Sequence, residues 1–329
     1  MRIAIDAMGG DHAPGLIVQG ALEAAKEWPD VQLVLVGDKT AIEPLLKEGL
    51  PSNVTLHHAD EVIGADDEPV RAVRRKKGSS MVIAGQLVKD KQVDAMLSAG
   101  NTGALMTTGL LVVGRMEGIE RPALAPILPT MGSGGVLSLD MGANMDAKPE
   151  HLLQYAIMGS IYRAKVHGVQ NPRVGLLNVG SEAKKGNELT KAAYELLENA
   201  PIQFVGNVES RDVFDGKCDV LVCDGFAGNI LLKAMEGTAG AIFSTLKEAF
   251  GSSLLTKLAA AIMLPKLKTL KQKLDYKEHG GAPLLGLNGL VIKCHGSSDA
   301  YAVKNAVRQA RIALQANLTE SISAEINRK

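Results

Sequence analysis

The sequence predicts an α/β protein with a mostly parallel sheet and helices on both of its faces. Short apolar runs rich in strand-forming residues alternate with segments of helical spacing along most of the 329 residues. Many of the apolar runs end in a short glycine-containing loop, which is typical of the turn between a parallel strand and the next helix. We expect a single α/β domain over residues 1–329, because a chain of this length can bury one large core.

The expected elements follow one another from the first residues. Pro69 and Pro149 suit the first turn of a helix, and Asp299 suits the position just before one. The expected strands are residues 2–7, 31–36, 54–58, 136–140, 174–178, 203–208 and 290–294, besides the two apolar runs described next. The expected helices are residues 16–28, 41–49, 69–77, 79–89, 149–168, 188–199 and 300–327.

One pattern occurs twice, 125 residues apart. In residues 93–106 and again in residues 218–230, an aspartate opens an apolar run, and two glycines spaced by three follow it before a helical segment. We expect the two loops to form facing walls of one site, although ordinary strand-to-helix turns would carry the same glycines. The corresponding residues are Asp94 and Asp219, Gly100 and Gly225, and Gly103 and Gly228.

Composition excludes several classes of protein. The net charge is zero, which removes the general argument for nucleic-acid binding. The three cysteines form no Cys-x-x-Cys pair, which argues against a disulfide scaffold or a structural zinc site and fits reduced thiols in the cytosol. The first residues enter a strand without the apolar stretch of a signal peptide, and no uncharged run has the roughly 18 residues needed to cross a bilayer.

The loops after the expected strands share a small set of glycine, asparagine and serine residues. If the strands are parallel, these loops converge at one edge of the sheet, where amide donors and helix N-termini suit a phosphate or a developing oxyanion. None of the loops matches the P-loop or the dinucleotide-binding fingerprint, so the prediction rests on their recurrence. The loops are Gly9–Gly10, Gly100–Asn101, Gly142–Asn144, Gly186–Asn187, Gly228–Asn229 and Gly296–Ser298.

Few side chains in these loops carry chemistry. Lys184 and Lys185 lie in a glycine-rich loop, where an ammonium could bind phosphate or could simply be solvated. His12 and His295 could act as general acid or base, or could bond a backbone carbonyl group. Cys223 fits a buried strand position better than a nucleophile, and the chain has no Gly-x-Ser-x-Gly elbow.

Four aspartates near strand ends, Asp6, Asp11, Asp140 and Asp146, could hold a metal ion. Their spacing matches no EF-hand or zinc pattern, so we favour roles in turns and caps. We expect no metal and no cofactor. If the reaction is a group transfer, direct attack by a bound acceptor is simpler than a covalent intermediate on the enzyme.

Two segments are basic. Residues 71–77 could attract an acidic partner or could form a solvated helix face. Residues 249–274 contain no acidic residue but five lysines, with leucines on one helical face on either side of Pro265. We expect a protruding helical hairpin at about residues 250–278 that meets a lipid surface, a second subunit or both.

Along nearly its whole length the chain resembles the bacterial phosphate acyltransferases of phospholipid synthesis. The motifs that carry the resemblance occur in the same order, and none is missing. They are Asp6-Ala7-Met8-Gly9-Gly10-Asp11, Asp67-Glu68-Pro69-Val70-Arg71-Ala72-Val73-Arg74, Ser98-Ala99-Gly100-Asn101-Thr102-Gly103-Ala104, Met141-Gly142-Ala143-Asn144 with Lys148-Pro149-Glu150-His151, Lys185-Gly186-Asn187-Glu188, Asp224-Gly225-Phe226-Ala227-Gly228-Asn229 and His295-Gly296-Ser297-Ser298.

The resemblance implies transfer of a long fatty acyl group from acyl carrier protein to inorganic phosphate. It implies a Rossmann-like three-layer α/β/α sandwich related to the isocitrate dehydrogenase and phosphotransacetylase folds. It also implies a homodimer that attaches loosely to the cytoplasmic membrane face and passes its product to a membrane-embedded glycerol-3-phosphate acyltransferase. The alternatives are a dehydrogenase that uses NAD and a metal on a related fold, and a membrane-surface scaffold without enzymatic activity.

The loops and the resemblance together define the candidate site. The candidate catalytic residues are Lys185, Lys184 and Asn229. The candidate substrate-binding residues are Asp6, Gly9, Gly10, His12, Ser98, Gly100, Asn101, Thr102, Gly103, Asn144, Asn187, Gly225, Gly228, His295 and Ser297. The candidate carrier-docking residues are Arg71, Arg74, Arg75 and Lys76, and the candidate membrane-contacting residues are Leu254, Leu255, Leu258, Ile262 and Leu267.

Overall fold

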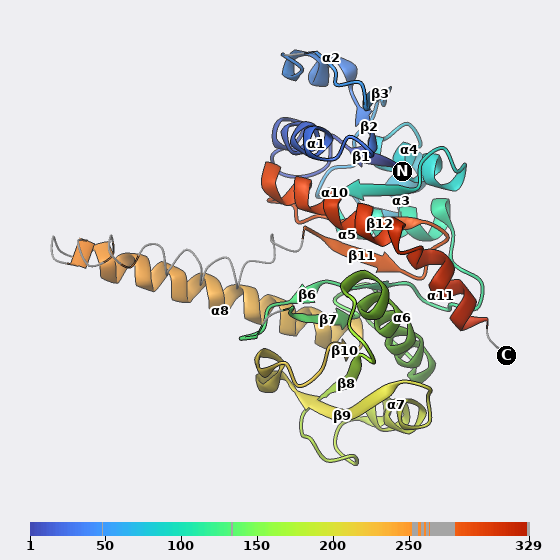
Figure 1. Ribbon diagram of the computed structural model, residues 1–329, viewed down its shortest axis with the longest axis vertical. Coiled ribbons are helices and arrows are strands. Elements are labelled where there is room, and N and C mark those ends of the chain that lie inside the picture. The colour runs from blue at the N-terminus through green and yellow to red at the C-terminus, as the bar shows by residue number, and fades with distance from the viewer. Residues whose placement is uncertain are drawn as a thin grey trace.

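The chain folds around two mostly parallel sheets with helices packed against them, as Figure 1 shows for the computed structural model. The structure describes residues 1–47, 49–132, 134–251, 256–257, 260, 263 and 280–327. The predicted α/β class with helices on both faces of a mostly parallel sheet is confirmed. The prediction that all the loops share one sheet edge is wrong, because the strands divide into a seven-stranded and a five-stranded sheet.

The seven-stranded sheet has the order β3-β2-β1-β4-β12-β11-β5. Its first five strands are parallel, and β11 is antiparallel to both of its neighbours. The strands are β3 (Val54–His58), β2 (Gln32–Gly37), β1 (Arg2–Asp6), β4 (Ala95–Ser98), β12 (Leu290–Lys293), β11 (Ala282–Leu285) and β5 (Ala123–Leu124).

Two helix layers cover this sheet, and the alternation of side chains along β1 assigns a core to each. Ile3 and Ile5 pack with the apolar faces of α1 (Gly15–Glu27) and α10 (Ala300–Gln315), which contact each other. Ala4 belongs to a second core. The helices on that side are α3 (Pro69–Arg75), α4 (Ser80–Lys89) and α5 (Thr102–Thr108), followed by a π-helical turn, Gly109–Val113.

The five-stranded sheet has the order β6-β7-β10-β8-β9 and is parallel except for β6. Its strands are β6 (Ile127–Leu128), β7 (Val136–Leu139), β10 (Val220–Val222), β8 (Arg173–Asn178) and β9 (Gln203–Glu209). Three helices accompany it: α6 (Pro149–His167), α7 (Glu188–Glu198) and α8 (Gly225–Gly251). Helix α8 is 27 residues long and projects away from both sheets (Figure 1).

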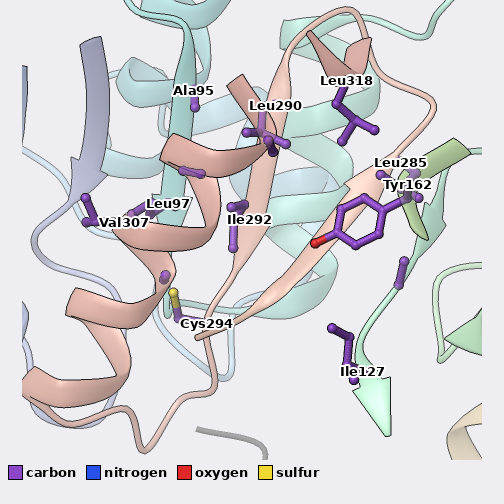
Figure 2. Close-up of a cluster of buried hydrophobic side chains, with 14 of the residues drawn as sticks. Ala95, Leu97, Ile127, Tyr162, Leu285, Leu290, Ile292, Cys294, Val307 and Leu318 are labelled. Atoms are coloured by element: carbon purple, nitrogen blue, oxygen red, sulfur yellow. The ribbon is translucent and has the colours of Figure 1, made fainter. Parts of the chain in front are cut away.

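One apolar core joins the two sheets. Figure 2 shows Tyr162 of α6 beside side chains of the seven-stranded sheet and of the C-terminal helices, and these residues belong to one buried cluster. The hydroxyl group of Tyr162 accepts a hydrogen bond of 2.7 Å from the side-chain amide of Gln309 in α10. The relative position of the two sheet edges is therefore set by close packing, in which small changes of volume are costly.

Two expectations about elements need correction, and one stretch for which no element was expected contains two short strands. The helix expected over residues 300–327 is broken at Asn317, whose φ of 47° is left-handed, so that α10 is followed by a separate helix, α11 (Leu318–Ile326). The segment expected at 41–49 forms only α2 (Lys39–Ile42) and a 3-10 turn, Glu43–Leu45. The proline-rich stretch 122–129 contains β5 and β6, one in each sheet, and a further 3-10 turn covers Ser210–Asp215.

The hairpin expected at 250–278 lies almost entirely outside the described residues, including the candidate membrane-contacting residues Leu254, Leu255, Leu258, Ile262 and Leu267. In the part of the chain that the structure describes, no helix has both the length and the apolar character to span a bilayer.

Candidate functional site

The glycine-rich loops gather in two groups, one at the carboxyl edge of each sheet. The first group contains the loops after β1, β4 and β12, which are neighbouring strands. The second contains the loops after β7, β10 and β8, which are also neighbours. Open α/β folds bind ligands at the carboxyl edge of a parallel sheet, so each group of loops can form one side of a binding site.

A buried carboxylate, Asp6, organises the first group. It accepts hydrogen bonds of 2.6 Å from the hydroxyl groups of both Ser80 and Ser98, and the Ser98 oxygen in turn accepts the backbone N–H of Gly100 at 3.0 Å. Burial raises the pKa of Asp6, and these hydrogen bonds partly oppose that shift. Asp6 and Ser98, both predicted to bind substrate, therefore use their oxygens to shape the loop after β4.

Glycine is required at Gly9 by the close approach of the loops after β1 and β4. A methyl group at Gly9 would lie 2.7 Å from the backbone nitrogen of Gly100 and 2.5 Å from a carboxylate oxygen of Asp6. Gly10 has a left-handed φ of 109° and faces the carbonyl oxygen of Gly296 in the loop after β12. The first group is thus a closely packed set of loops with little free space around its glycines.

The start of α5 leaves amide groups available. The side-chain oxygen of Asn101 caps the helix by accepting the N–H of Ala104 at 3.1 Å, and its amide donates to the carbonyl oxygens of Ala65 and Asp67. Within the described residues, the N–H groups of Thr102 and Gly103 have no hydrogen-bond partner. Asn101 therefore serves the local structure, and the open donors at this loop belong to the backbone.

The loop after β12 completes the first group. Its backbone accepts the N–H of Asp11 at the Gly296 oxygen, at 2.8 Å, which ties it to the loop after β1. Nδ1 of His295 lies 2.9 Å from the hydroxyl group of Ser297. Burial lowers the pKa of His295, and the charges of Lys233 and Lys293 lower it further, while Glu236 and Asp11 oppose them. His12 is exposed at the start of the same group.

A second buried carboxylate, Asp140, organises the second group. It accepts the backbone N–H groups of Leu124, Ala143 and Asn144 and the side-chain amide of Asn144. Burial raises the pKa of Asp140 to about 6, against the opposing hydrogen bonds. The amide of Asn144 also donates to the carbonyl oxygen of Pro122 and the hydroxyl group of Tyr155. The side-chain amide N–H groups of Asn144 are consequently engaged by other groups of the protein.

The start of α8 is packed tightly against Asp140 and Asn144. A methyl group at Gly228 would overlap the carbonyl oxygen of Asp140, and one at Gly225 would lie 2.6 Å from the carbonyl oxygen of Asn144. One carboxylate oxygen of Asp224 accepts two N–H groups in the first turn of the helix. These first-turn N–H groups are therefore satisfied by the protein, and any ligand at this loop must use side chains.

Asn229 is the side chain in the second turn of α8 that remains available. It faces Gly142 in the loop after β7, and it makes no hydrogen bond within the described part of the chain. Lys233 and Glu236 follow on the same helix face and form an ion pair of 2.8 Å. The charges of both residues act on the pKa of His295 after β12, so this face of α8 lies toward that loop.

The predicted lysines are exposed in the loop after β8. The ammonium groups of Lys184 and Lys185 form no ion pair or hydrogen bond within the described residues. Asn187, by contrast, caps α7 by accepting the N–H of Thr190 at 2.9 Å. Because β8 and β10 are adjacent and parallel, the lysine loop emerges at the same sheet edge as the start of α8.

The basic helix α3 lies against α5, beside the first group of loops. The ring of Pro69 in α3 would be only 2.6 Å from a methyl group at Gly103. Arg71, Arg74 and Arg75 are exposed, whereas Lys76 forms an ion pair of 2.6 Å with Asp67. Within the described residues, three of the four predicted docking residues therefore contact no carboxylate, whereas the fourth, Lys76, forms an ion pair.

Lys293 is the residue of this region that the sequence analysis missed. It ends β12 after three buried apolar residues, and its backbone pairs with Ser98 at the end of β4. In the sequence, Lys293 is a single lysine at the end of an otherwise apolar strand. The alternation of side chains along a strand already explains such a lysine as an outward-facing residue, so it did not indicate a site. Among the described residues, no three His, Cys, Asp or Glu side chains gather at one point.

Comparison with known proteins assigns the chain to a family. A family model described as "Fatty acid synthesis protein" matches residues 1–321. The "Phosphate acyltransferase" of Brevibacillus brevis is 59% identical over 328 residues, covering 100% of this chain and 98% of its own length. The chain belongs to the phosphate acyltransferase family. A relative of the same name from Oceanobacillus iheyensis is 59% identical and covers 99% of this chain and 97% of its own length. The family resemblance seen in the motifs is thereby confirmed, and the chain is an acyl-transferring enzyme of fatty acid synthesis.

Solved structures confirm the fold expected for the family. A phosphotransacetylase from Streptococcus pyogenes superposes with a TM-score of 0.59 at 16% identity, covering 96% of this chain and 94% of its own. A branched-chain phosphotransacylase from Enterococcus faecalis superposes with a TM-score of 0.53 at 14% identity, covering 95% and 99%. At these identities the likeness concerns the fold alone.

Proposed function

We propose that the enzyme transfers a long-chain fatty acyl group from the thioester of acyl carrier protein to inorganic phosphate. An oxygen of bound phosphate attacks the thioester carbonyl carbon, the carbon–sulfur bond breaks, and the carrier leaves as the thiolate. The products are acyl phosphate and free carrier. This function is the most specific one that the family, the loop chemistry and the basic helix support together.

The observation that carries the proposal is the available amide of Asn229, which faces Gly142 in the loop after β7. An amide N–H that is not used by the protein can stabilise the oxyanion that forms when phosphate attacks the thioester. Lys185, together with Lys184, supplies positive charge to phosphate from the adjacent loop. In this scheme the rate comes from positioning and charge stabilisation.

The cysteines support direct attack by phosphate rather than an acyl-enzyme. Cys218, Cys223 and Cys294 are all buried. Burial raises the pKa of Cys218 to about 12, that of Cys294 to about 11, and that of Cys223 well above its ordinary value. Because the thiolate is the reactive form, none of the three is a good nucleophile near neutral pH.

The partners follow from charge and shape. The exposed arginines of α3 suit an acidic carrier protein, and they lie beside the loop after β4, close to where a thioester would enter. Helix α8 extends away from the body (Figure 1). It exposes apolar side chains such as Ile242, which is 54% exposed. This projection supports a homodimer at the cytoplasmic membrane surface, where an oily acyl phosphate could pass to a membrane-embedded glycerol-3-phosphate acyltransferase.

The test is the release of carrier thiol from palmitoyl-carrier protein, with and without phosphate. We expect thiol release that requires phosphate, and turnover about a hundredfold lower in purified Lys185→Ala and Asn229→Ala variants. Lys191→Ala, a change on the surface of α7, is the matched control and should retain activity. Thiol release that does not depend on phosphate would refute the reaction. Near wild-type turnover in both Lys185→Ala and Asn229→Ala would remove these residues from the mechanism.

The two alternatives predict different results. A dehydrogenase would bind NAD and a divalent metal, which an equilibrium binding measurement would detect. A membrane-surface scaffold would bind liposomes but would consume no thioester in the presence of phosphate.

A further inference from the structure

Lys293 is a cation at the carboxyl edge of the seven-stranded sheet that the reaction as described does not use. The strand before it, Leu290 to Ile292, is fully buried, and Lys293 itself is half-buried. Its backbone pairs with Ser98, the last residue before the Gly100 loop. The side chain therefore starts within the first group of loops, beside the end of β4.

The ammonium group of Lys293 has one protein partner. It donates to the carbonyl oxygen of Cys294, and no carboxylate of the described residues lies within ion-pair distance of it. An ammonium group carries three donor hydrogens, so two remain open. The nearby carboxylate of Asp6 is already occupied by the hydroxyl groups of Ser80 and Ser98 and by backbone N–H groups.

The electrostatic surroundings leave this charge undercompensated. Burial lowers the pKa of Lys293, Cys294, Asp6 and Asp11 act in the opposite direction, and the charge of Lys233 on α8 lowers it further. A half-buried ammonium group without a carboxylate contact is costly unless an anion binds it. Since Lys233 lies one helical turn after Asn229, the same surroundings include the residue on which the proposed chemistry depends.

We propose that Lys293 binds an oxygen of the acceptor phosphate from the seven-stranded sheet, on the opposite wall from Asn229. The inference rests on the proposed function and deepens it by assigning a phosphate contact on each wall. Phosphate would then be held between the two sheets, its oxygens accepting hydrogen bonds from Lys293 on one side and from Asn229 and the Lys184–Lys185 loop on the other. Such bracketing restricts the direction from which phosphate can attack the thioester.

A structural role is the competing explanation, and it makes the opposite prediction for stability. If Lys293 only balances the charge of Asp6, its removal should destabilise the protein without phosphate and leave any effect of phosphate unchanged. If Lys293 binds phosphate, removing a buried and unpaired charge should leave the melting temperature without phosphate unchanged or higher. The stabilisation that phosphate confers on the folded state should then be reduced or lost.

The experiment compares Lys293→Met with wild type and with Lys304→Met. Lys304 is a lysine of similar exposure on α10, and it forms an ion pair of 2.5 Å with Glu27, so its substitution controls for loss of a lysine elsewhere. For Lys293→Met we expect the KM for phosphate to rise about ten- to a hundredfold, with the KM for palmitoyl-carrier protein nearly unchanged. Lys304→Met should change neither constant.

Thermal unfolding with and without inorganic phosphate gives a second readout that does not need turnover. Lys293→Gln keeps a donor for the Cys294 carbonyl oxygen, so it tests the loss of charge alone should the methionine variant fail to fold. In both variants the phosphate-induced rise in melting temperature should be smaller than in wild type. An unchanged rise in either folded variant, or an unchanged KM for phosphate, would overturn the inference.

The two proposals fail in different ways. Wild-type enzyme without phosphate-dependent thiol release would refute the reaction itself. Active wild-type enzyme together with a Lys293→Met variant whose KM for phosphate is normal would refute only the assignment of Lys293.

Discussion

The two copies of the repeated pattern, residues 94–103 and residues 219–228, share one scaffold but leave different groups available to a ligand. Each copy opens with an aspartate that clamps the first residue of a neighbouring parallel strand through the same two backbone contacts. Asp94 accepts the N–H of Arg2 at 2.7 Å and donates its own N–H to the Arg2 carbonyl oxygen. Asp219 makes the same pair of contacts with Arg173, at 2.8 Å each. The repeat seen in the sequence is thus also a repeat of structure.

The bracing of the two loops is also similar. A buried aspartate at the end of the adjacent strand contacts each one: the Asp6 carboxylate accepts the Ser98 hydroxyl group in the first copy, and the Asp140 carbonyl oxygen accepts the Cys223 thiol in the second. Beyond this point the copies differ. In the first, the side chains of Ser98 and Asn101 are engaged and the N–H groups of Thr102 and Gly103 are open among the described residues. In the second, the first-turn N–H groups are capped by Asp224.

The difference shows that a glycine loop after a strand does not by itself specify a backbone anion site. Which donors are open depends on the neighbours that occupy the rest. The second loop offers Asn229 rather than its backbone, and a model of catalysis based only on helix N-termini would place the ligand at the wrong atoms. The following predictions test this comparison, beginning with the largest expected effect.

Gly228→Ala should be the most damaging single change. The added methyl group would overlap the carbonyl oxygen of Asp140, a backbone atom that cannot move without displacing the loop after β7. We expect a loss of about 4 kcal/mol or failure to fold. Gly103→Ala should cost about 1–3 kcal/mol, because its contact is with the ring of Pro69. Urea unfolding measures both.

Gly240→Ala is the control for these glycine substitutions. Nothing lies within 4 Å of the added methyl group in α8 among the described residues, so alanine should stabilise the helix by about 0.5–1 kcal/mol. Equal stabilities of Gly228→Ala and Gly240→Ala would contradict the close packing inferred at the second loop.

Asp140 should make stability fall as the pH rises. Its pKa is about 6 in the folded protein against an ordinary value of 3.8, so the folded state holds the proton more tightly. This contribution is fully present below the unfolded value and is lost as the pH rises through the folded value, by up to about 3 kcal/mol. The measurement is the free energy of unfolding between pH 4 and 8 for wild type and Asp140→Asn. The variant should lack this part of the slope, and parallel curves would refute the assignment.

Asn101→Ala and Asn229→Ala should distinguish a side chain that stabilises the fold from one that acts in catalysis. Asn101 caps α5 and bonds two carbonyl oxygens, so its loss should cost about 1–2 kcal/mol of stability. Asn229 makes no hydrogen bond within the described residues, so its loss should change stability by less than about 0.5 kcal/mol while turnover falls. Chemical denaturation of the two variants, combined with the thiol-release assay, distinguishes them. A large stability loss in Asn229→Ala would show that the side chain is structural.

Asp94 and Asp219 should contribute slightly different amounts to the free energy of unfolding. Asp219 also binds the guanidinium group of Arg173, at 3.0 Å, whereas the side chain of Arg2 donates instead to the Lys91 carbonyl oxygen. We expect Asp219→Asn to cost about 1 kcal/mol and Asp94→Asn about half of that. Burial raises the pKa of Asp219, but the Arg173 hydrogen bonds outweigh it and leave the pKa below its ordinary value. The Asp219 contribution should therefore be present above that ordinary value and lost as the pH falls through the lowered one, as acid unfolding curves can show.

Local sequence signals predicted most of the elements because periodicity and capping are local properties. The helix expected to begin at Pro149 begins there, and it ends at Gly168, whose φ is 68°. The aspartate before residue 300 does cap α10, by accepting the N–H of Ala302. By contrast, β5 and β6 are two residues each, and they exist only because distant strands pair with them. No pattern within residues 122–129 could have assigned them to different sheets.

In the candidate site, too, local signals could be predicted from the sequence and long-range contacts could not. The loops, the lysines and Asn229 were found from glycine spacing and from the family motifs. That Ser98 and Asn144 are occupied by the protein's own groups could not be predicted, because their partners include Asp6 and Pro122, which lie far away in the sequence. Lys293 was missed for the corresponding reason, since a strand-ending lysine becomes informative only when its surroundings lack a carboxylate partner.

The sequence by itself determined the alternation of strands and helices, the repeated aspartate–glycine pattern and the family, since each depends on residue type and spacing along the chain. The tertiary structure decided that the strands form two sheets, that the start of α8 packs against the loop after β7, and which donors of each copy stay open. The physical reason is that hydrogen-bond capacity is finite, and packing determines which neighbours use it. In the loop at Gly100, that competition leaves backbone amides open, and in the loop at Gly225 it leaves the side chain of Asn229.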